Sequence, residues 1–123
     1  MTAPVGPINR NKLGCCGVMS PLYYVFRVEK QSDGILHFLD YYFKSNMWHD
    51  FMFKNGNSGA RSDRFSISDS TFSLMPILYP QKEEEQLNIG QVFINMEKLM
   101  RTESIKLSKF RSMKQSLLQK MFI

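Results

Sequence analysis

The C-terminal third of the chain, residues 83–123, has no proline, a single glycine and regularly spaced apolar side chains. They recur in steps of three and four residues or sums of these steps, which places them on one stripe of an α-helix, close to a heptad seam. Glutamates begin the segment and lysines lie toward its end, an order that the helix macrodipole favours. We therefore predict one long helix over residues 81–123. Its stripe consists of Ile89, Phe93, Met96, Met100, Leu107, Phe110, Leu117 and Met121.

Such a helix needs a partner along part of its length. With roughly 37 residues it would be about 55 Å long at the usual rise per residue, which exceeds any face of a small globule. Glu103 and Lys114 fall on the same seam, where a plain core helix would carry apolar groups. We predict a homodimer in which two copies pair as an antiparallel coiled coil about a two-fold axis. The expected interface residues are Phe93, Met96, Met100, Leu107, Phe110, Leu117 and Met121.

The composition is that of a folding protein with one core. The chain has 123 residues, of which 43% are hydrophobic, and no apolar run approaches the length of a membrane span. Residues 1–10 lack the apolar core of a signal peptide, so we expect a cytoplasmic protein without a membrane partner. Cys15 and Cys16 are adjacent and seldom bridge in that position. No Cys/His spacing offers a metal site, and we expect neither a metal nor a cofactor.

The charge balance permits a polyanionic partner. The net charge is +5 and the pI about 9.3. A well-solvated basic protein explains this excess equally well, so charge alone does not choose between the two. Much of the excess lies on the C-terminal helix, where it can solvate the outer face of a coiled coil. The residues concerned are Lys106, Lys109, Arg111, Lys114 and Lys120.

The first half of the chain predicts a loop, a strand and two helices. Residues 1–20 are rich in Gly, Pro and Asn, as loops are. Residues 21–30 (PLYYVFRVEK) are β-branched and aromatic, which predicts a strand. Residues 34–53 have helical spacing, Ser32 or Asp33 can cap them, and a break near Ser45 divides them into two helices.

The next segments complete an α+β fold. Residues 54–70 form a loop dense in Gly, Asn and Ser. Residues 72–79 (FSLMPILY) resemble a short strand, which Pro76 restricts to an edge or to its own end. The predicted order is strand, helix, loop, strand and long helix, with residues 1–80 as one domain. This order makes an α+β or α/β unit followed by the long helix.

No catalytic motif stands out. The sequence has no HExxH, no P-loop, no methyltransferase-type Asn-Pro-Pro-Tyr and no Ser/His/Asp arrangement that can be placed. A small hydrolase would have to use His37 or His49 beside Asp40 or Asp50. These are ordinary residues of a predicted helix, so we expect a protein that is not an enzyme.

Two stretches resemble the specificity subunits of type I restriction–modification systems. The first is SPLYYVFRVEK (20–30), followed by the aromatic helix and the loop GNSGAR (56–61). The second begins at Pro80 with P-x-x-x-E-E-Q-x-x-I-G and ends in KLSKFRSMKQSLLQKMF (106–122). The closing helix is the more specific of the two motifs. The resemblance covers nearly all of this chain.

The resemblance implies a non-catalytic DNA-specificity component. Subunits of that family have two target-recognition domains, each followed by a conserved helix, and the two helices pair antiparallel. Residues 1–80 would be the C-terminal part of one recognition domain, truncated at its start, and residues 81–123 its conserved helix. The implied partners are double-stranded DNA, methyltransferase (modification) subunits and, through these, the restriction subunit. The alternative is a small coiled-coil interaction protein that does not touch DNA.

With the resemblance, the loop over residues 54–64 is the predicted DNA contact. A Gly-rich backbone can approach phosphates, and arginines bind phosphate or the edge of a guanine in a bidentate manner. Residues 9–12 form a second polar loop that can lie beside it. From the residues alone, a solvated loop whose arginines pair with Asp63 or Asp69 is the favoured interpretation. The predicted DNA-binding residues are Arg61, Arg64, Ser62, Asn57, Lys54, Arg10 and Lys12.

Overall fold

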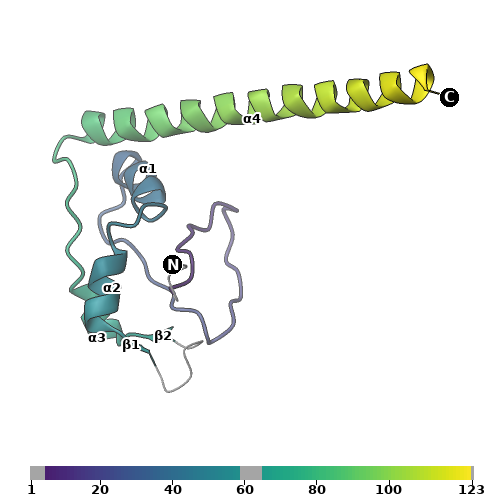
Figure 1. Cartoon of the computed structure of the whole chain (residues 1–123). Helices are drawn as coiled ribbons and strands as arrows, with labels where there is room; N and C mark the ends of the chain where they lie inside the picture. Colours follow the sequence, from purple (N-terminus) through teal and green to yellow (C-terminus); the bar gives the residue numbers. More distant parts are fainter. Residues whose placement is uncertain (1–4, 59–64, 123) are drawn as a thin grey trace. The chain divides into compact units, whose positions relative to one another are not determined.

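The computed structural model describes residues 5–58 and 65–122 (Figure 1). Contacts divide the chain into two compact units, Met1–Gly90 and Gln91–Ile123. The elements in chain order are α1 (Asp33–Tyr42), α2 (His49–Asn55), β1 (Asn57–Ser58), β2 (Phe65–Ser66), α3 (Asp69–Ser73) and α4 (Glu83–Met121). Within the described ranges the regular structure is therefore mostly helical. Its only strands, β1 and β2, form one antiparallel pair, so the predicted α+β class is not confirmed.

Helices α1 and α2 are the two helices that the sequence predicts on either side of a break. Ser32 caps α1, because its Oγ accepts a hydrogen bond from the backbone N–H of Ile35 at 3.3 Å. The helix ends at Tyr42, and the hydroxyl of Ser45 then donates to the carbonyl of Tyr42 at 2.6 Å. The same hydroxyl accepts from the N–H of Met47. One serine thus satisfies two backbone groups in the turn, which confirms the predicted break.

The core of the first unit is small and aromatic. Trp48 is only 2% exposed, and its indole N–H donates to the carbonyl of Phe43 at 3.1 Å across the turn between α1 and α2. The bond satisfies a buried polar group that would otherwise oppose burial of the indole. The buried apolar residues are Leu39, Phe43, Trp48, Met52 and Phe72.

Residues 21–30 are not a strand, and this prediction is wrong. The segment is irregular, and the N–H of Tyr23 donates a hydrogen bond to the carbonyl of Ser20, which is a local turn contact. A strand requires a hydrogen-bonding neighbour, and the described chain places none beside it. Two of its rings still touch the edge of the core: the ring centroids of Tyr24 and Phe26, which are 42% and 38% exposed, lie 4.7 and 5.0 Å from that of Phe72. The aromatic character of the segment therefore serves packing rather than a β-ladder.

The second predicted strand, over residues 72–79, is also wrong. Phe72 and Ser73 belong to α3, whose N-terminus is capped by Ser68 through a bond from the N–H of Thr71 at 3.2 Å. The residues that follow have no regular structure up to α4. Pro76 removes a backbone donor from the middle of the segment, so that it cannot sustain a ladder.

The predicted long helix is confirmed as α4, with 39 residues. Gln86 and Gly90 are its buried residues. The side-chain amide of Gln86 donates to the carbonyl of Pro80 at 2.6 Å, which fixes the chain entering the helix. A Cβ built on Gly34 of α1 would lie 2.8 Å from Oε1 of Gln86, so this oxygen rests directly against the glycine. The first turns of α4 thereby pack onto α1 within the first unit.

None of the helices in residues 5–58 and 65–122 combines the length with the apolar composition needed to cross a bilayer.

Candidate DNA-contact and helix-pairing surfaces

Residues 54–70, predicted as one loop, contain in their described part the end of α2, the β1–β2 pair and the start of α3, so the prediction is wrong for those residues. Asn57 pairs with Ser66 and Ser58 with Phe65, so the residues that flank positions 59–64 lie next to each other. The ring of Phe65 packs onto Gly56, where a Cβ would collide with it. Glycine at this position therefore allows the aromatic ring to close the base of the pair.

The predicted residues of this loop fall on both sides of the described boundary. Lys54, in the last turn of α2, and Asn57, in β1, are exposed. The carbonyl of Asn57 accepts a long hydrogen bond from the hydroxyl of Ser66. Arg61, Ser62 and Arg64 lie outside the described residues. Their assignment to DNA binding stays a prediction.

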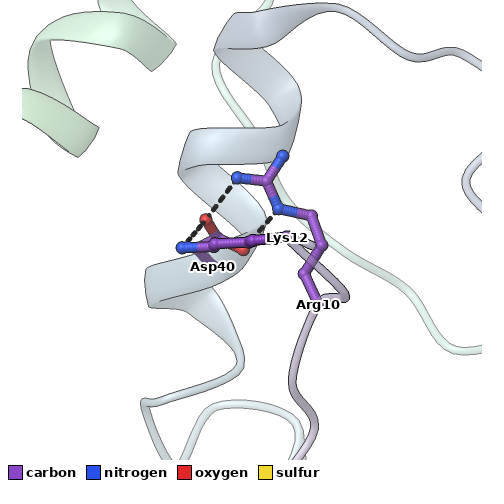
Figure 2. Close-up of polar contacts among 3 residues, drawn as sticks. All are labelled: Arg10, Lys12 and Asp40. Atoms are coloured by element: carbon purple, nitrogen blue, oxygen red, sulfur yellow. Dashed lines mark hydrogen bonds and ion pairs between the residues drawn. The ribbon is translucent and has the colours of Figure 1, made fainter. Parts of the chain in front are cut away.

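Arg10 and Lys12, the other two predicted DNA-binding residues, share one carboxylate (Figure 2). Arg10 donates to both oxygens of Asp40, from Nε at 3.0 Å and from Nη2 at 2.7 Å. Lys12 Nζ lies 2.8 Å from Oδ2 of the same residue. The Asp40 side chain, on α1, is 9% exposed, so the two cations cover it. This bidentate geometry is the strong form of an arginine–carboxylate contact.

The ion cluster attaches the irregular N-terminal segment to α1. Two positive charges face one negative charge, so the cluster carries a net charge of +1. Sequence reasoning did not identify Asp40 as a partner of these cations, because no local spacing relates residue 10 to residue 40. The turn that follows the two cations is local: Asn11 accepts from the N–H of Leu13 and donates to the carbonyl of Cys15, and Gly14 has a φ of 70°.

The histidines and tyrosines of α1 and α2 lie in packed surroundings. Cβ of His37 faces Gly90 of α4. The ring of His49 lies 4.4 Å from that of Trp48 between centroids, and His49 also lines an open depression with Phe43. Burial raises the pKa of the Tyr42 hydroxyl, because the apolar surroundings disfavour the phenolate. Asp40, which a hydrolase would have to use beside His37, is engaged by Arg10 and Lys12 instead.

Within residues 5–58 and 65–122, no three His, Cys, Asp or Glu side chains gather closely enough to hold a metal ion. Cys15 and Cys16 are free and exposed.

The apolar stripe of α4 is exposed along the second unit. The exposed fractions of its members run from 43% for Phe93 to 74% for Met121. Glu103, on the same stripe, forms an exposed ion pair with Lys106 at 3.3 Å. An exposed pair of this kind contributes little to stability and can be exchanged for another partner.

The two surfaces thus differ in kind. The polar candidates are Lys54 and Asn57 near the β1–β2 pair and, separately, the cluster of Arg10, Lys12 and Asp40. The other surface is an apolar stripe on a single helix, interrupted by Glu103 and Lys114. No family model, no curated protein and no solved structure matches this chain.

Proposed function

We propose that this chain is a non-catalytic DNA-specificity component of a type I restriction–modification complex. Residues 1–80 contact double-stranded DNA, and α4 pairs antiparallel with the α4 of a second copy while docking methyltransferase subunits and, through them, the restriction subunit. Support comes from the resemblance of residues 20–30, 56–61, 80–90 and 106–122 to that family. The observation that carries the proposal is the exposed apolar stripe of a 39-residue helix.

The stripe is too long to be left in water. From Phe93 to Met121 it extends about 42 Å at the usual helical rise. A contiguous apolar surface of this size is typical of an interaction site. Its alternating steps of three and four residues suit the side chains of another helix, which insert between them as knobs into holes. A helix is therefore the partner that this surface fits best.

DNA contact is supported by the polar segment that follows α2 and by the basic charge of the chain. The paired residues 57–58 and 65–66 bring the flanks of positions 59–64 together. Lys54 in the last turn of α2 and Asn57 in β1 are exposed. Arg61 and Arg64 lie between the paired ends in the sequence, where they can bind phosphates.

The test is the salt dependence of binding to a mixed-sequence DNA duplex. The chain is expected to bind at low salt, and replacing Arg61 and Arg64 together by alanine should reduce the slope of log K against log salt by about 2, since each lost phosphate contact removes about 0.9. The matched control is Lys30→Ala with Arg27→Ala, which removes the same charge elsewhere. Equal losses in the two double variants would show a general charge effect and count against the loop.

One observation favours a second candidate, a coiled-coil interaction protein without DNA binding. Arg10 and Lys12 are occupied by Asp40, which removes much of their availability for phosphate. Under this alternative the chain binds no duplex at low salt, while α4 still pairs. Measuring both properties on one preparation separates the two candidates.

A further inference from the structure

The spacing of the seam residues of α4 is symmetric about the midpoint of the seam. Between Met96 and Met121 the seam positions alternate in steps of four and three residues, and the midpoint falls between Ser108 and Lys109. The whole stretch lies in the unit Gln91–Ile123. The seam residues in order are Met96, Met100, Glu103, Leu107, Phe110, Lys114, Leu117 and Met121.

When a second copy is placed antiparallel about this midpoint, each seam residue of one copy faces a seam residue of the other. Reversing one helix reverses its alternation of steps, and because the pattern is symmetric every seam side chain then faces another seam side chain. Glu103 and Lys114 lie equally far from the midpoint on its two sides, so each faces the other in the pair. The facing pairs are Met96 with Met121, Met100 with Leu117, Glu103 with Lys114, and Leu107 with Phe110, each occurring twice.

The seam charges favour this antiparallel register over a parallel pair and over a shifted antiparallel pair. A parallel, in-register pair would bring Glu103 against Glu103 and Lys114 against Lys114. An antiparallel pair shifted to a midpoint between residues 103 and 107 would set Glu103 against Leu107 and Lys114 against Met96. A buried charge without a partner is strongly destabilising, and like charges in contact repel. Only the midpoint between Ser108 and Lys109 makes two opposite-charge pairs from the four seam charges.

The remaining charges of the helix do not oppose this pairing. At 100° per residue, Lys98, Arg101 and Lys109 lie on the side of α4 that faces away from the seam. Both Glu103 and Lys106 are exposed, so the pair between them leaves the carboxylate accessible to a lysine of another helix. Lys98, Arg101 and Lys109 therefore remain in water when the seam is covered, whereas Lys106 and Arg111 flank the seam.

We propose that the covering partner of the α4 seam is a second copy of this chain, in the register that joins Glu103 to Lys114 of the partner on both sides of the two-fold axis. Glu103 and Lys114 are the specificity-determining residues of the interface, and the methionines and leucines supply its apolar burial. The inference rests on the proposed function, in which α4 pairs with the α4 of a second copy, and it adds the register and the charged pair that sets it.

Disulfide trapping in the full chain tests the register directly. With Cys15 and Cys16 replaced by serine, a chain carrying Met100→Cys is mixed with one carrying Leu117→Cys under mild oxidation. The mixed disulfide is expected in high yield, because these positions face each other. The control mixture, Met100→Cys with Phe110→Cys, matches the shifted register. Crosslinking in the control rather than in the first mixture overturns the proposed register while leaving helix pairing intact.

Charge exchange tests the specificity pair. Glu103→Lys and Lys114→Glu are each expected to weaken self-association at least about tenfold. Each substitution creates two contacts between like charges in the dimer, at positions 103 and 114 of opposite chains. Mixing the two variants should restore association, since the lysine introduced at position 103 then faces the glutamate introduced at position 114. The native Glu103 of one chain and the native Lys114 of the other face each other as before. Sedimentation equilibrium measures all three samples. Single variants that associate as strongly as the wild type would refute the role of the pair.

The outcomes also distinguish this inference from the proposed function. A wild-type chain that dimerises in another register retains pairing and DNA contact but loses the Glu103–Lys114 assignment. A chain that remains a monomer and associates only when a methyltransferase subunit is added shows that the seam docks that subunit, and this overturns both the register and the self-pairing of α4 in the proposed function. Loss of both duplex binding and helix pairing defeats the proposed function itself.

Discussion

Gly90 of α4 lies against His37 of α1 so closely that a Cβ built on the glycine would be 2.9 Å from Cβ of the histidine. At a second point between the same two helices, a Cβ built on Gly34 of α1 would lie 2.8 Å from both Oε1 of Gln86 and Cγ of Glu83 in α4. Each helix thus contributes a glycine at the point where the other approaches. The two glycines set the distance between α1 and the first turns of α4, and larger residues would force them apart.

Replacement of Gly90 by alanine is expected to destabilise the first unit by about 1–3 kcal/mol. The gain in helix propensity, about 1 kcal/mol, is outweighed by the collision with Cβ of His37, which a packed contact cannot relieve without a backbone shift. Urea unfolding measures the change. The control is Gly17→Ala, at a glycine with no atom within 4 Å of the added carbon. A Gly90→Ala chain as stable as the wild type would contradict the close packing.

Replacement of Trp48 by phenylalanine is expected to cost about 2–3 kcal/mol. The change leaves the carbonyl of Phe43 without its indole donor and opens space at the most buried side chain of the core. Thermal unfolding followed by circular dichroism gives the loss. Met47→Ala, at a neighbouring residue that is 73% exposed, serves as the control and is expected to change stability by no more than about 0.5 kcal/mol.

Replacement of Asp40 by asparagine is expected to release the N-terminal segment and to strengthen binding to DNA. Arg10 and Lys12 lose their shared carboxylate, so amide hydrogens of residues 5–15 should exchange faster, and both cations become available to phosphates. Asp50→Asn makes the same charge change at an exposed position of α2. Equal affinity of the two variants for a mixed-sequence duplex would show that releasing the pair adds no phosphate contact.

Stability is expected to fall at alkaline pH because of Tyr42. Its pKa is raised by burial in the folded chain, so the unfolded chain loses this proton first as the pH rises. The contribution is fully present below the ordinary tyrosine pKa of about 10 and is lost as the pH rises through the raised folded value. Tyr42→Phe should therefore lessen the alkaline decline in the free energy of unfolding. Tyr23→Phe, on an exposed ring, is the matched control, and an identical decline in wild type and Tyr42→Phe would contradict the prediction.

Sequence patterns correctly predicted α1, α2 and α4, whose hydrogen bonds are local, although they missed the short helix α3. Every backbone bond inside α4 joins residues four apart, so a proline-free segment with one apolar stripe is enough to predict it. The cap at Ser32 and the break at Ser45 depend on partners two to three residues away. The seam charges Glu103 and Lys114 were likewise visible in the sequence, because their spacing along one helix defines their face.

Tertiary contacts decided the rest. Residues 21–30 have the composition of a strand. A strand forms only beside a second strand, and within the described residues no strand pairs with this segment. The engagement of Arg10 and Lys12 by Asp40 joins positions 28 and 30 residues apart in the chain, and the approach of Gly90 to His37 spans more than fifty. Helix periodicity is a property of neighbours along the chain, whereas ion pairs and helix contacts depend on which distant segments the fold brings together. The sequence by itself therefore determined the long helix and its seam, and only the tertiary structure decided which cations are paired and where two helices meet.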